Sequence, residues 1–274
     1  MKQRILTALV LTPIAVAIIL LAPTPLFAAI VAIAFLLALW EWTRLVGLES
    51  MPARIVATMV GALLLGAAWY LRDEGIWPAL IGLGLAWWLV SLAWLRSHSF
   101  AASPSPANRV LKLVVGYLVI VPAWVALLAI HSIDPLGHWW ALFALALVWA
   151  ADTFAYFAGS RFGRRKLAPR ISPGKTVEGA IGAFAGGALV AVAGGWLLDQ
   201  RGLALVLLVA LAVLTLAASI IGDLVESLVK RQANVKDSGA LFPGHGGLLD
   251  RLDSVFAAMP VFAAGKMLID TCAP

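Results

Sequence analysis

Residues 203–222 read LALVLLVALAVLTLAASIIG, a stretch without a charged side chain. At about 1.5 Å per residue, roughly 20 helical residues cross the ~30 Å hydrocarbon core of a bilayer. Similar stretches recur along the chain, which is 62% apolar and only 12% charged. Soluble domains carry about twice that share of charge. The sequence therefore predicts an all-α protein, a polytopic helical bundle integral to a membrane.

We predict about nine transmembrane helices, at 5–21, 26–43, 55–71, 77–95, 113–130, 139–158, 177–198, 203–222 and 254–270. The first has features of a signal peptide, because Lys2 and Arg4 precede an apolar run. The second apolar segment follows immediately, which favours an uncleaved first span. The single cysteine, Cys272, excludes an internal disulfide and a cysteine-rich metal site.

The lysines and arginines predict the orientation, since cytoplasmic loops carry an excess of them. With the N-terminus inside, the cytoplasm receives Lys2, Arg4, Arg44, Arg54, Arg96, Arg109, Lys112 and the bases of 159–176 and 223–253. Only Arg72, Arg201 and Lys266 fall on or toward the other side. We therefore expect a multi-pass protein of the cytoplasmic (inner) membrane with its active site on the cytoplasmic side. Orientation and phosphate binding explain the net charge of +6, so no nucleic-acid partner is expected.

Half of the charged residues lie in two segments, 152–178 and 223–253. Charged groups near a membrane interior cost roughly 2.5–3.5 kcal/mol each on insertion scales, so such clusters indicate a functional site. We expect little buried polarity in the first five spans. The chain then divides into an N-terminal transmembrane scaffold, 1–110, and a transmembrane catalytic region, 111–274.

The eighth span is predicted to continue past Asp223 as a helix with one polar face. Asp223, Glu226, Ser227 and Lys230 are spaced i, i+3, i+4 and i+7, so they share that face. Two acids and a base in this arrangement suit a metal with phosphate ligands. An interfacial ladder of salt bridges explains the spacing equally well.

A glycine-rich turn, Pro243-Gly244-His245-Gly246-Gly247, precedes a second pair of acids, Asp250 and Asp253. The turn leaves the backbone free to approach a ligand. The acids share a face if a helix starts there, although acids also suit a helix start for purely electrostatic reasons. Brought close to Asp223, they would offer oxygen ligands for Mg²⁺. Phosphate-binding charge would come from Lys230, Arg231, Lys236 and Arg251.

The earlier segment, 152–178, adds bases and one deeply placed acid. Lys175 lies just before the seventh span, whose N-terminus attracts phosphate. The arginines of loop 159–176 are explained better by topology and contact with anionic lipid. Asp152 lies about 9 Å inside its span at helical rise, where a carboxylate needs a partner or a wet cavity.

The run Ser227-x-x-Lys230-Arg231-x4-Lys236-Asp237-x5-Pro243-Gly244-His245-Gly246-Gly247-x-x-Asp250-Arg251-x-Asp253 resembles the signature of the phosphatidate cytidylyltransferase family. Ala151-Asp152-Thr153 through Gly159, and Ile171-Ser172-Pro173-Gly174-Lys175-Thr176-Val177-Glu178-Gly179, resemble its upstream motifs. Gly174 departs from the lysine or asparagine that is more often expected there. The resemblance covers roughly residues 145–270; the N-terminal half matches only as a hydrophobic multi-span region.

The resemblance implies that CTP and phosphatidic acid react, with Mg²⁺ alone or with a second cation, to give CDP-diacylglycerol and pyrophosphate. It implies catalytic roles for Asp223, Lys230, Arg231, Lys236, Asp250, Arg251 and Asp253, with Asp223, Asp250 and Asp253 as metal ligands. It implies substrate binding by Asp152, Ser172, Lys175, Glu178, Glu226, Ser227, Asp237, His245, Gly246 and Gly247. A homodimer is a further expectation of the resemblance.

Two other classes of function fit parts of the sequence. Carboxylates within spans also occur in transporters and ion channels, but here most acids cluster on one side of the membrane. A lipid phosphatase or an alcohol phosphotransferase is the third interpretation. The uninterrupted run from Lys230-Arg231 to Asp253 favours the cytidylyltransferase.

Overall fold

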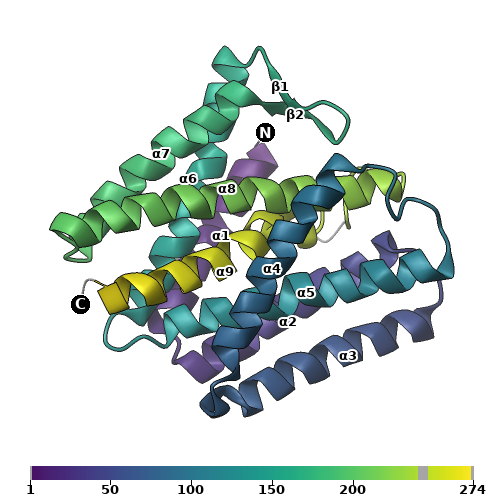
Figure 1. The fold of residues 1–274 in the computed structure, drawn as a ribbon, viewed down its shortest axis with the longest axis horizontal. Helices are drawn as coiled ribbons and strands as arrows, with labels where there is room; N and C mark the ends of the chain where they lie inside the picture. The colour runs from purple at the N-terminus through teal and green to yellow at the C-terminus, as the bar shows by residue number, and fades with distance from the viewer. Residues whose placement is uncertain (1, 240–245, 273–274) are drawn as a thin grey trace.

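The computed structural model describes residues 2–239 and 246–272, and within them the chain forms nine α-helices and one short hairpin (Figure 1). In order the elements are α1 (Lys2–Leu21), α2 (Thr24–Leu45), α3 (Met51–Tyr70), the 3-10 turn η1 (Arg72–Glu74), α4 (Ile76–Arg96), α5 (Pro106–His131), α6 (Gly137–Phe162), β1 (Lys166–Ala168), β2 (Ser172–Thr176), α7 (Val177–Leu197), α8 (Gly202–Gln232) and α9 (Leu249–Cys272).

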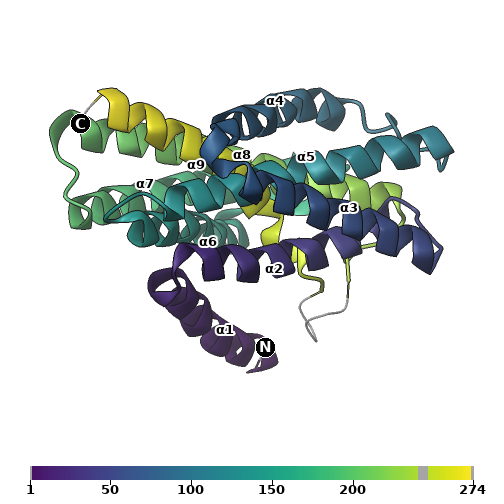
Figure 2. The same cartoon turned by 90° about the horizontal axis from the view of Figure 1, so that it is seen from below.

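The predicted helical membrane architecture is confirmed. In the described part of the chain, eight helices, α2 to α9, are long and apolar enough to cross a membrane. Helix α1 contributes a shorter apolar stretch, Leu11–Leu21, and lies below the main bundle in Figure 2. Leucines on α3, α4 and α7, such as Leu63, Leu89 and Leu189, are more than 60% exposed, as lipid-facing side chains would be.

Helices α5 and α9 form the centre of the bundle. Helix α9 lies between α8 and α5 and packs against both (Figure 1). Its small residues Ala257 and Ala258 are fully buried, so neighbouring helices approach closely. The charges near its far end are satisfied: the buried Lys266 pairs with Asp270 and lies 4.2 Å above the ring of Trp140. The last predicted span is therefore a well-packed helix.

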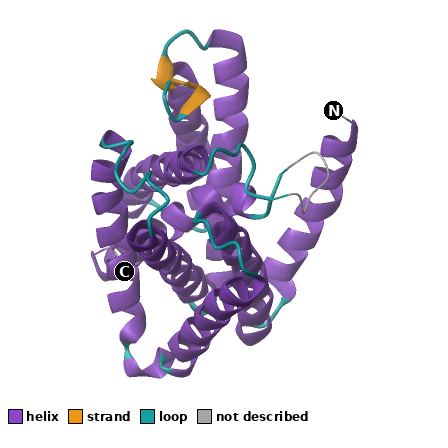
Figure 3. Cartoon of the chain, turned by 90° about the vertical axis from the view of Figure 1, so that its right-hand side faces the viewer, coloured by secondary structure: helices purple, strands orange, loops and turns teal. Residues whose placement is uncertain are grey.

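The segment that we expected to be a loop, 159–176, instead contains an antiparallel hairpin (Figure 3). Lys166 pairs with Thr176 and Ala168 with Ser172. The strand Ser172–Thr176 contains a proline and a glycine, two residue types that are rare in strands. The sequence therefore did not predict a strand here. Thr176 ends β2 and caps α7 by accepting a hydrogen bond from the Gly179 amide at 3.0 Å.

The expectation of little buried polarity in the first five spans is wrong. Five polar side chains in the corresponding helices are buried: Glu41, Thr43, Ser91, Lys112 and His131. Helix α2, which carries Glu41, packs against α9 as well as against α3 and α5. The division of the chain at residue 110 remains a prediction.

Candidate active site

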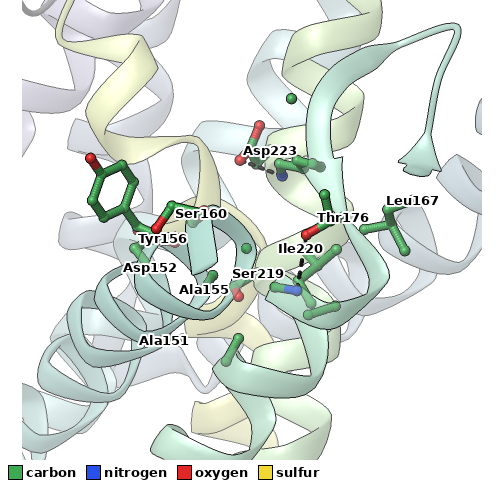
Figure 4. Close-up of a pocket in the computed structure, with 17 residues that line it drawn as sticks. Ala151, Asp152, Ala155, Tyr156, Ser160, Leu167, Thr176, Ser219, Ile220 and Asp223 are labelled. Carbon is green, nitrogen blue, oxygen red and sulfur yellow. Dashed lines mark hydrogen bonds and ion pairs between the residues drawn. The ribbon is translucent and has the colours of Figure 1, made fainter. Parts of the chain in front are cut away.

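A pocket of about 480 Å³ lies among α6, the hairpin, α7 and α8 (Figure 4). Asp152 lines it from α6, Lys175 from β2 and Asp223 from α8. Most of the lining is apolar, with hydroxyls from Ser160, Thr176 and other residues. The structure therefore brings three of the predicted site residues together in one cavity.

Asp223 and Lys175 form an ion pair inside this pocket. Asp223 also accepts a hydrogen bond from the Ser227 hydroxyl at 3.2 Å, one helical turn along α8. The predicted polar face of α8 is thus confirmed as a geometric feature. The hairpin places Lys175 opposite this face because β2 runs directly into α7, whose N-terminus lies beside the pocket.

Two further acids act on the Asp223 carboxylate. Asp152 and Asp253 both interact electrostatically with Asp223 and with Lys175, and the charge of Arg251 acts on Asp152. Asp152 was expected to need a partner or a wet cavity, and its exposed side chain lines the pocket. Three carboxylates therefore interact here with two cations: Lys175, which contacts Asp223 directly, and Arg251, which acts on Asp152 through its charge.

These carboxylates do not by themselves form a closed metal cage. Among the described residues, no group of three or more His, Cys, Asp or Glu side chains is arranged to hold a metal ion. Mg²⁺ does not require such a cage, because it usually keeps several waters and binds one or two carboxylates plus substrate phosphates. Asp223, which lines the pocket, fits that pattern, and Asp253 is near enough to interact with it electrostatically.

Lys230 is the centre of a second group of residues, which we call the loop network: Glu41, Glu226, Lys230, Ser238 and Asp250. Its ammonium lies 2.5 Å from Glu226 Oε2 and 2.6 Å from Asp250 Oδ1. Glu226 is buried and neither of its oxygens accepts a hydrogen bond of good geometry, so its ion pair with Lys230 is what balances its charge among the described contacts. The predicted salt-bridge ladder thus coexists with the pocket on neighbouring turns of α8.

Asp250 is fully engaged in this network. It accepts hydrogen bonds from the Ser238 amide at 3.0 Å, the Ser238 hydroxyl at 3.0 Å and the Gly247 amide at 2.8 Å, besides the Lys230 contact. A carboxylate with this many donors has little capacity left for a metal. Of the three predicted metal ligands, Asp250 therefore holds the loop in this structure, and Asp223 lines the pocket. Asp253 does not line this pocket; it borders a small cavity beside Glu226 and interacts electrostatically with Asp223.

Glu41 is the important residue that the sequence did not reveal. It lies on α2 and is only 9% exposed. It accepts hydrogen bonds from the Leu248 amide at 3.1 Å, the Leu249 amide at 2.8 Å and the Ser238 hydroxyl at 2.9 Å. It therefore satisfies amides at the start of α9 from some 200 residues away. An acid inside an otherwise apolar span, Leu-Trp-Glu-Trp, was the only available signal.

Glycine is required where the loop meets these carboxylates. Gly246 has φ of +80°, and a Cβ there would approach Asp250 Oδ2 to 2.6 Å. A Cβ on Gly247 would collide with the Glu41 carboxylate and the Ser238 hydroxyl. Both predicted glycines thus shape the network and bring the Gly247 amide to Asp250.

Two predicted site residues hold the hairpin in place. Glu178, in the first turn of α7, accepts hydrogen bonds from the Arg164 and Arg165 amides and from Arg165 Nε at 2.9 Å. It does not line the pocket. Arg231 Nε donates to the Ile171 carbonyl at 3.2 Å, which ties the end of α8 to the hairpin.

The remaining predicted residues lie at the edge of the two groups. Lys236, Asp237 and Arg251 are exposed, and Ser172 is half-buried at the start of β2. His245 lies outside the described residues. The single site expected from the sequence is therefore two adjacent arrangements, the pocket and the loop network, joined by α8 and α9.

Comparison with known proteins shows the family of the chain. Residues 2–268 match the sequence profile of the cytidylyltransferase family. The chain belongs to this family. It is 45% identical over 264 residues to a phosphatidate cytidylyltransferase of Pseudomonas aeruginosa, covering 96% of each chain. It is 34% identical over 286 residues to that of Haemophilus influenzae, covering 96% of this chain and 97% of the relative.

A relative from Bacillus subtilis with the same name is 32% identical over 271 residues, covering 95% of each chain. The match extends across the N-terminal helices, including α2 with Glu41, and is not limited to residues 145–270. The predicted resemblance is confirmed, and this cytidylyltransferase is a nucleotidyl-transferring enzyme of the membrane. The transporter interpretation is thereby excluded.

Proposed function

We propose that the enzyme joins CTP to phosphatidic acid, releasing pyrophosphate and forming CDP-diacylglycerol for phospholipid synthesis. The observation that carries this proposal is the pocket, where Lys175 and Asp223 meet beside the loop network. The names of relatives that match the chain over nearly its whole length support the same substrates. The apolar lining suits a lipid, and the converging charges suit phosphate.

The reaction needs no protein nucleophile. A phosphate oxygen of phosphatidic acid attacks the α-phosphorus of CTP, and the bond from this phosphorus to the bridging oxygen of the β-phosphate breaks. The electron pair leaves with pyrophosphate. The phosphate monoester is already anionic near neutral pH, so catalysis reduces to alignment and neutralisation of charge. No His or Cys is among the described residues that line the pocket.

We assign different roles in binding and neutralising the phosphates to the cationic residues. Lys175 lies inside the pocket, held by Asp223, where it can meet a phosphate oxygen. Arg251 and Lys236 have exposed side chains near the loop, on the side from which the triphosphate of a soluble nucleotide would arrive. Lys230 is enclosed between two carboxylates and acts by holding Asp250 and the start of α9 in place.

We propose Mg²⁺ as the cofactor, with Asp223 and Asp253 as the residues that would hold it. Their oxygen donors match the preference of this ion. When bound, Mg²⁺ would neutralise phosphate charge and help to orient the two substrates. Asp152 lies near both acids and adds to the negative charge that attracts a cation. A second cation and a homodimer remain predictions.

We place the enzyme in the cytoplasmic membrane, with the pocket and the loop network on the cytoplasmic side. The asymmetry of lysines and arginines along the chain supports this orientation. A site at this boundary suits the reaction, because one substrate is soluble in water and the other is held in the bilayer.

A substrate assay tests the proposal. Purified protein is incubated with CTP, Mg²⁺ and mixed micelles that contain phosphatidic acid, and pyrophosphate release is measured. We expect release only when CTP and phosphatidic acid are both present, with CDP-diacylglycerol formed in equal amount. Equal release with diacylglycerol in place of phosphatidic acid, or with no lipid, would contradict the proposal.

A further inference from the structure

A second cavity lies on the other side of the hairpin from the pocket. It is a groove of about 510 Å³ between the end of α4, the hairpin and α8. Its walls are largely apolar and include Leu92, Leu95, Ile171 and Leu224. Leu167 of β1 lines both this groove and the pocket, so the two cavities are separated only by the hairpin.

The groove carries positive charge without balancing acids. Arg96 lines it from α4, Arg170 from the hairpin turn, and His98 from the segment after α4. Among the residues that the structure describes, no Asp or Glu lines it. The Arg96 and Arg170 side chains are exposed and make no ion pair or hydrogen bond to the described part of the chain.

The position of the groove suits the head of a membrane lipid. Arg96 is the last residue of the apolar helix α4 and so lies where this span leaves the hydrocarbon. Leu92 lines the groove one turn deeper, and Leu89, a further turn along, is 71% exposed. Acyl chains can therefore continue from the groove along α4, while the head remains level with the arginines.

We propose that this groove binds phosphatidic acid by its phosphate, and that the lipid reaches the reaction pocket from there. Two guanidinium groups are well matched to a phosphate monoester, which offers three terminal oxygens and nearly two negative charges. The apolar walls select a lipid over a soluble phosphate. This inference rests on the proposed function for the choice of lipid.

Arg231 links the groove to the catalytic helix. Its Nε holds the carbonyl of Ile171, a groove residue, while the same helix carries Asp223 into the pocket. A lipid head bound at Arg170 thus lies on a hairpin that is attached to α8 and that carries Lys175 on its second strand. The hairpin therefore borders both the groove and the pocket, with Leu167 lining each of them.

The test compares two double variants. Arg96→Gln/Arg170→Gln removes both charges from the groove, and Arg164→Gln/Arg201→Gln makes the same change at exposed arginines that line neither cavity. Exposed substitutions of this kind change stability little, so both variants should insert and fold. Native mass spectrometry measures phosphatidic acid retained by each protein from vesicles that also contain phosphatidylcholine and phosphatidylglycerol. Kinetic assays give KM for phosphatidic acid and for CTP.

We expect the groove variant to lose retained phosphatidic acid and to raise its KM about tenfold, with KM for CTP unchanged, because charge-assisted contacts to phosphate are lost. The control should match the wild type in both measurements. Equal retention by the groove variant, a rise in KM for CTP instead, or displacement of the lipid by CTP would overturn the inference. If arginine-dependent retention is found but the wild type releases no pyrophosphate from CTP, the groove stands and the proposed function fails.

Discussion

Lys230 contacts two carboxylates at once, and in this way it ties Glu226 on α8 to Asp250 in the first turn of α9. Glu226 is 3% exposed and has no other cationic partner among the described contacts. Removing one member of a buried ion pair typically costs about 3–5 kcal/mol, because the other charge is left unbalanced. Asp250 shares the same ammonium, so the loop network depends on each of its members.

Substitution of Asp223 or Asp253 should therefore have a different effect from substitution of Asp250, which belongs to the loop network. Asp223→Asn and Asp253→Asn should each lower kcat about 100-fold or more while leaving thermal stability nearly unchanged, because these acids would hold the cation that neutralises the bound phosphates. Asp250→Asn should lower activity and also destabilise the protein by about 1–3 kcal/mol, since it loses charge-assisted hydrogen bonds. Activity assays and thermal unfolding in detergent measure both effects.

Asp199→Asn, at an exposed site in the turn between α7 and α8, is the matched control for these carboxylates. It should leave activity and stability unchanged. Normal turnover by either Asp223→Asn or Asp253→Asn, at wild-type protein levels, would remove that residue from the proposed metal site.

A substitution at Glu41 tests whether a residue far from both cavities in the sequence positions the loop. Glu41→Gln keeps the size of the side chain but replaces one acceptor oxygen with a donor that faces amides and a hydroxyl. We expect kcat to fall about tenfold or more, with KM for CTP changed less, because the loop loses its position. Glu49→Gln, at an exposed site in the turn after α2, should have no effect. Equal kinetics for the two variants would show that Glu41 does not position the loop.

At the scale of elements, the hairpin is the feature that joins both cavities. Its base is held by Glu178, through two backbone amides and Arg165, and its tip by Arg231. The sequence predicted that Lys175 would lie near the seventh span, and this is confirmed. It did not predict that two short strands would direct Lys175 toward Asp223, because strand pairing depends on contacts remote in sequence.

The orientation of the hairpin can be measured directly. In a Cys272→Ala background, Arg164→Cys places a thiol at an exposed position next to the hairpin. A membrane-impermeant thiol reagent should fail to label it in intact cells and should label it after the membrane is permeabilised. Asp199→Cys, at the opposite ends of α7 and α8, should be labelled in intact cells. Labelling of Arg164→Cys from outside would reverse the proposed topology.

At the scale of the whole molecule, the sequence predicted the architecture well, because long apolar helices are recognised from composition alone. Residues such as Asp223, Asp250 and Lys230 were singled out because charges beside spans are rare, and their catalytic roles remain predictions. The sequence did not predict how α8 and α9 divide them, with Asp223 facing the pocket and Lys230 facing Asp250. That division depends on the angle at which the helices pack, and the link through Glu41 depends on contacts between distant helices.

The charges of the pocket and of the nearby loop should make the enzyme dependent on a divalent cation. Treatment with EDTA should abolish pyrophosphate release, and Mg²⁺ should restore it, because Lys175, Arg251 and Lys236 together cannot balance the charge of a triphosphate and a phosphate monoester. Detergent-solubilised protein should keep its thermal stability in EDTA, since the ion pairs of the loop network involve only protein groups. Undiminished turnover in EDTA would contradict the assignment of Mg²⁺.

The central claim is that the protein aligns two substrates and transfers the cytidylyl group directly from one to the other. The most direct measurement uses CTP labelled at its α-phosphate, with Mg²⁺, in a single turnover with and without phosphatidic acid. We predict that the label passes only to CDP-diacylglycerol, and that none stays on the denatured protein when lipid is absent. Label retained on the protein without lipid, and lost in His245→Ala, would contradict direct transfer and show a covalent intermediate on that histidine.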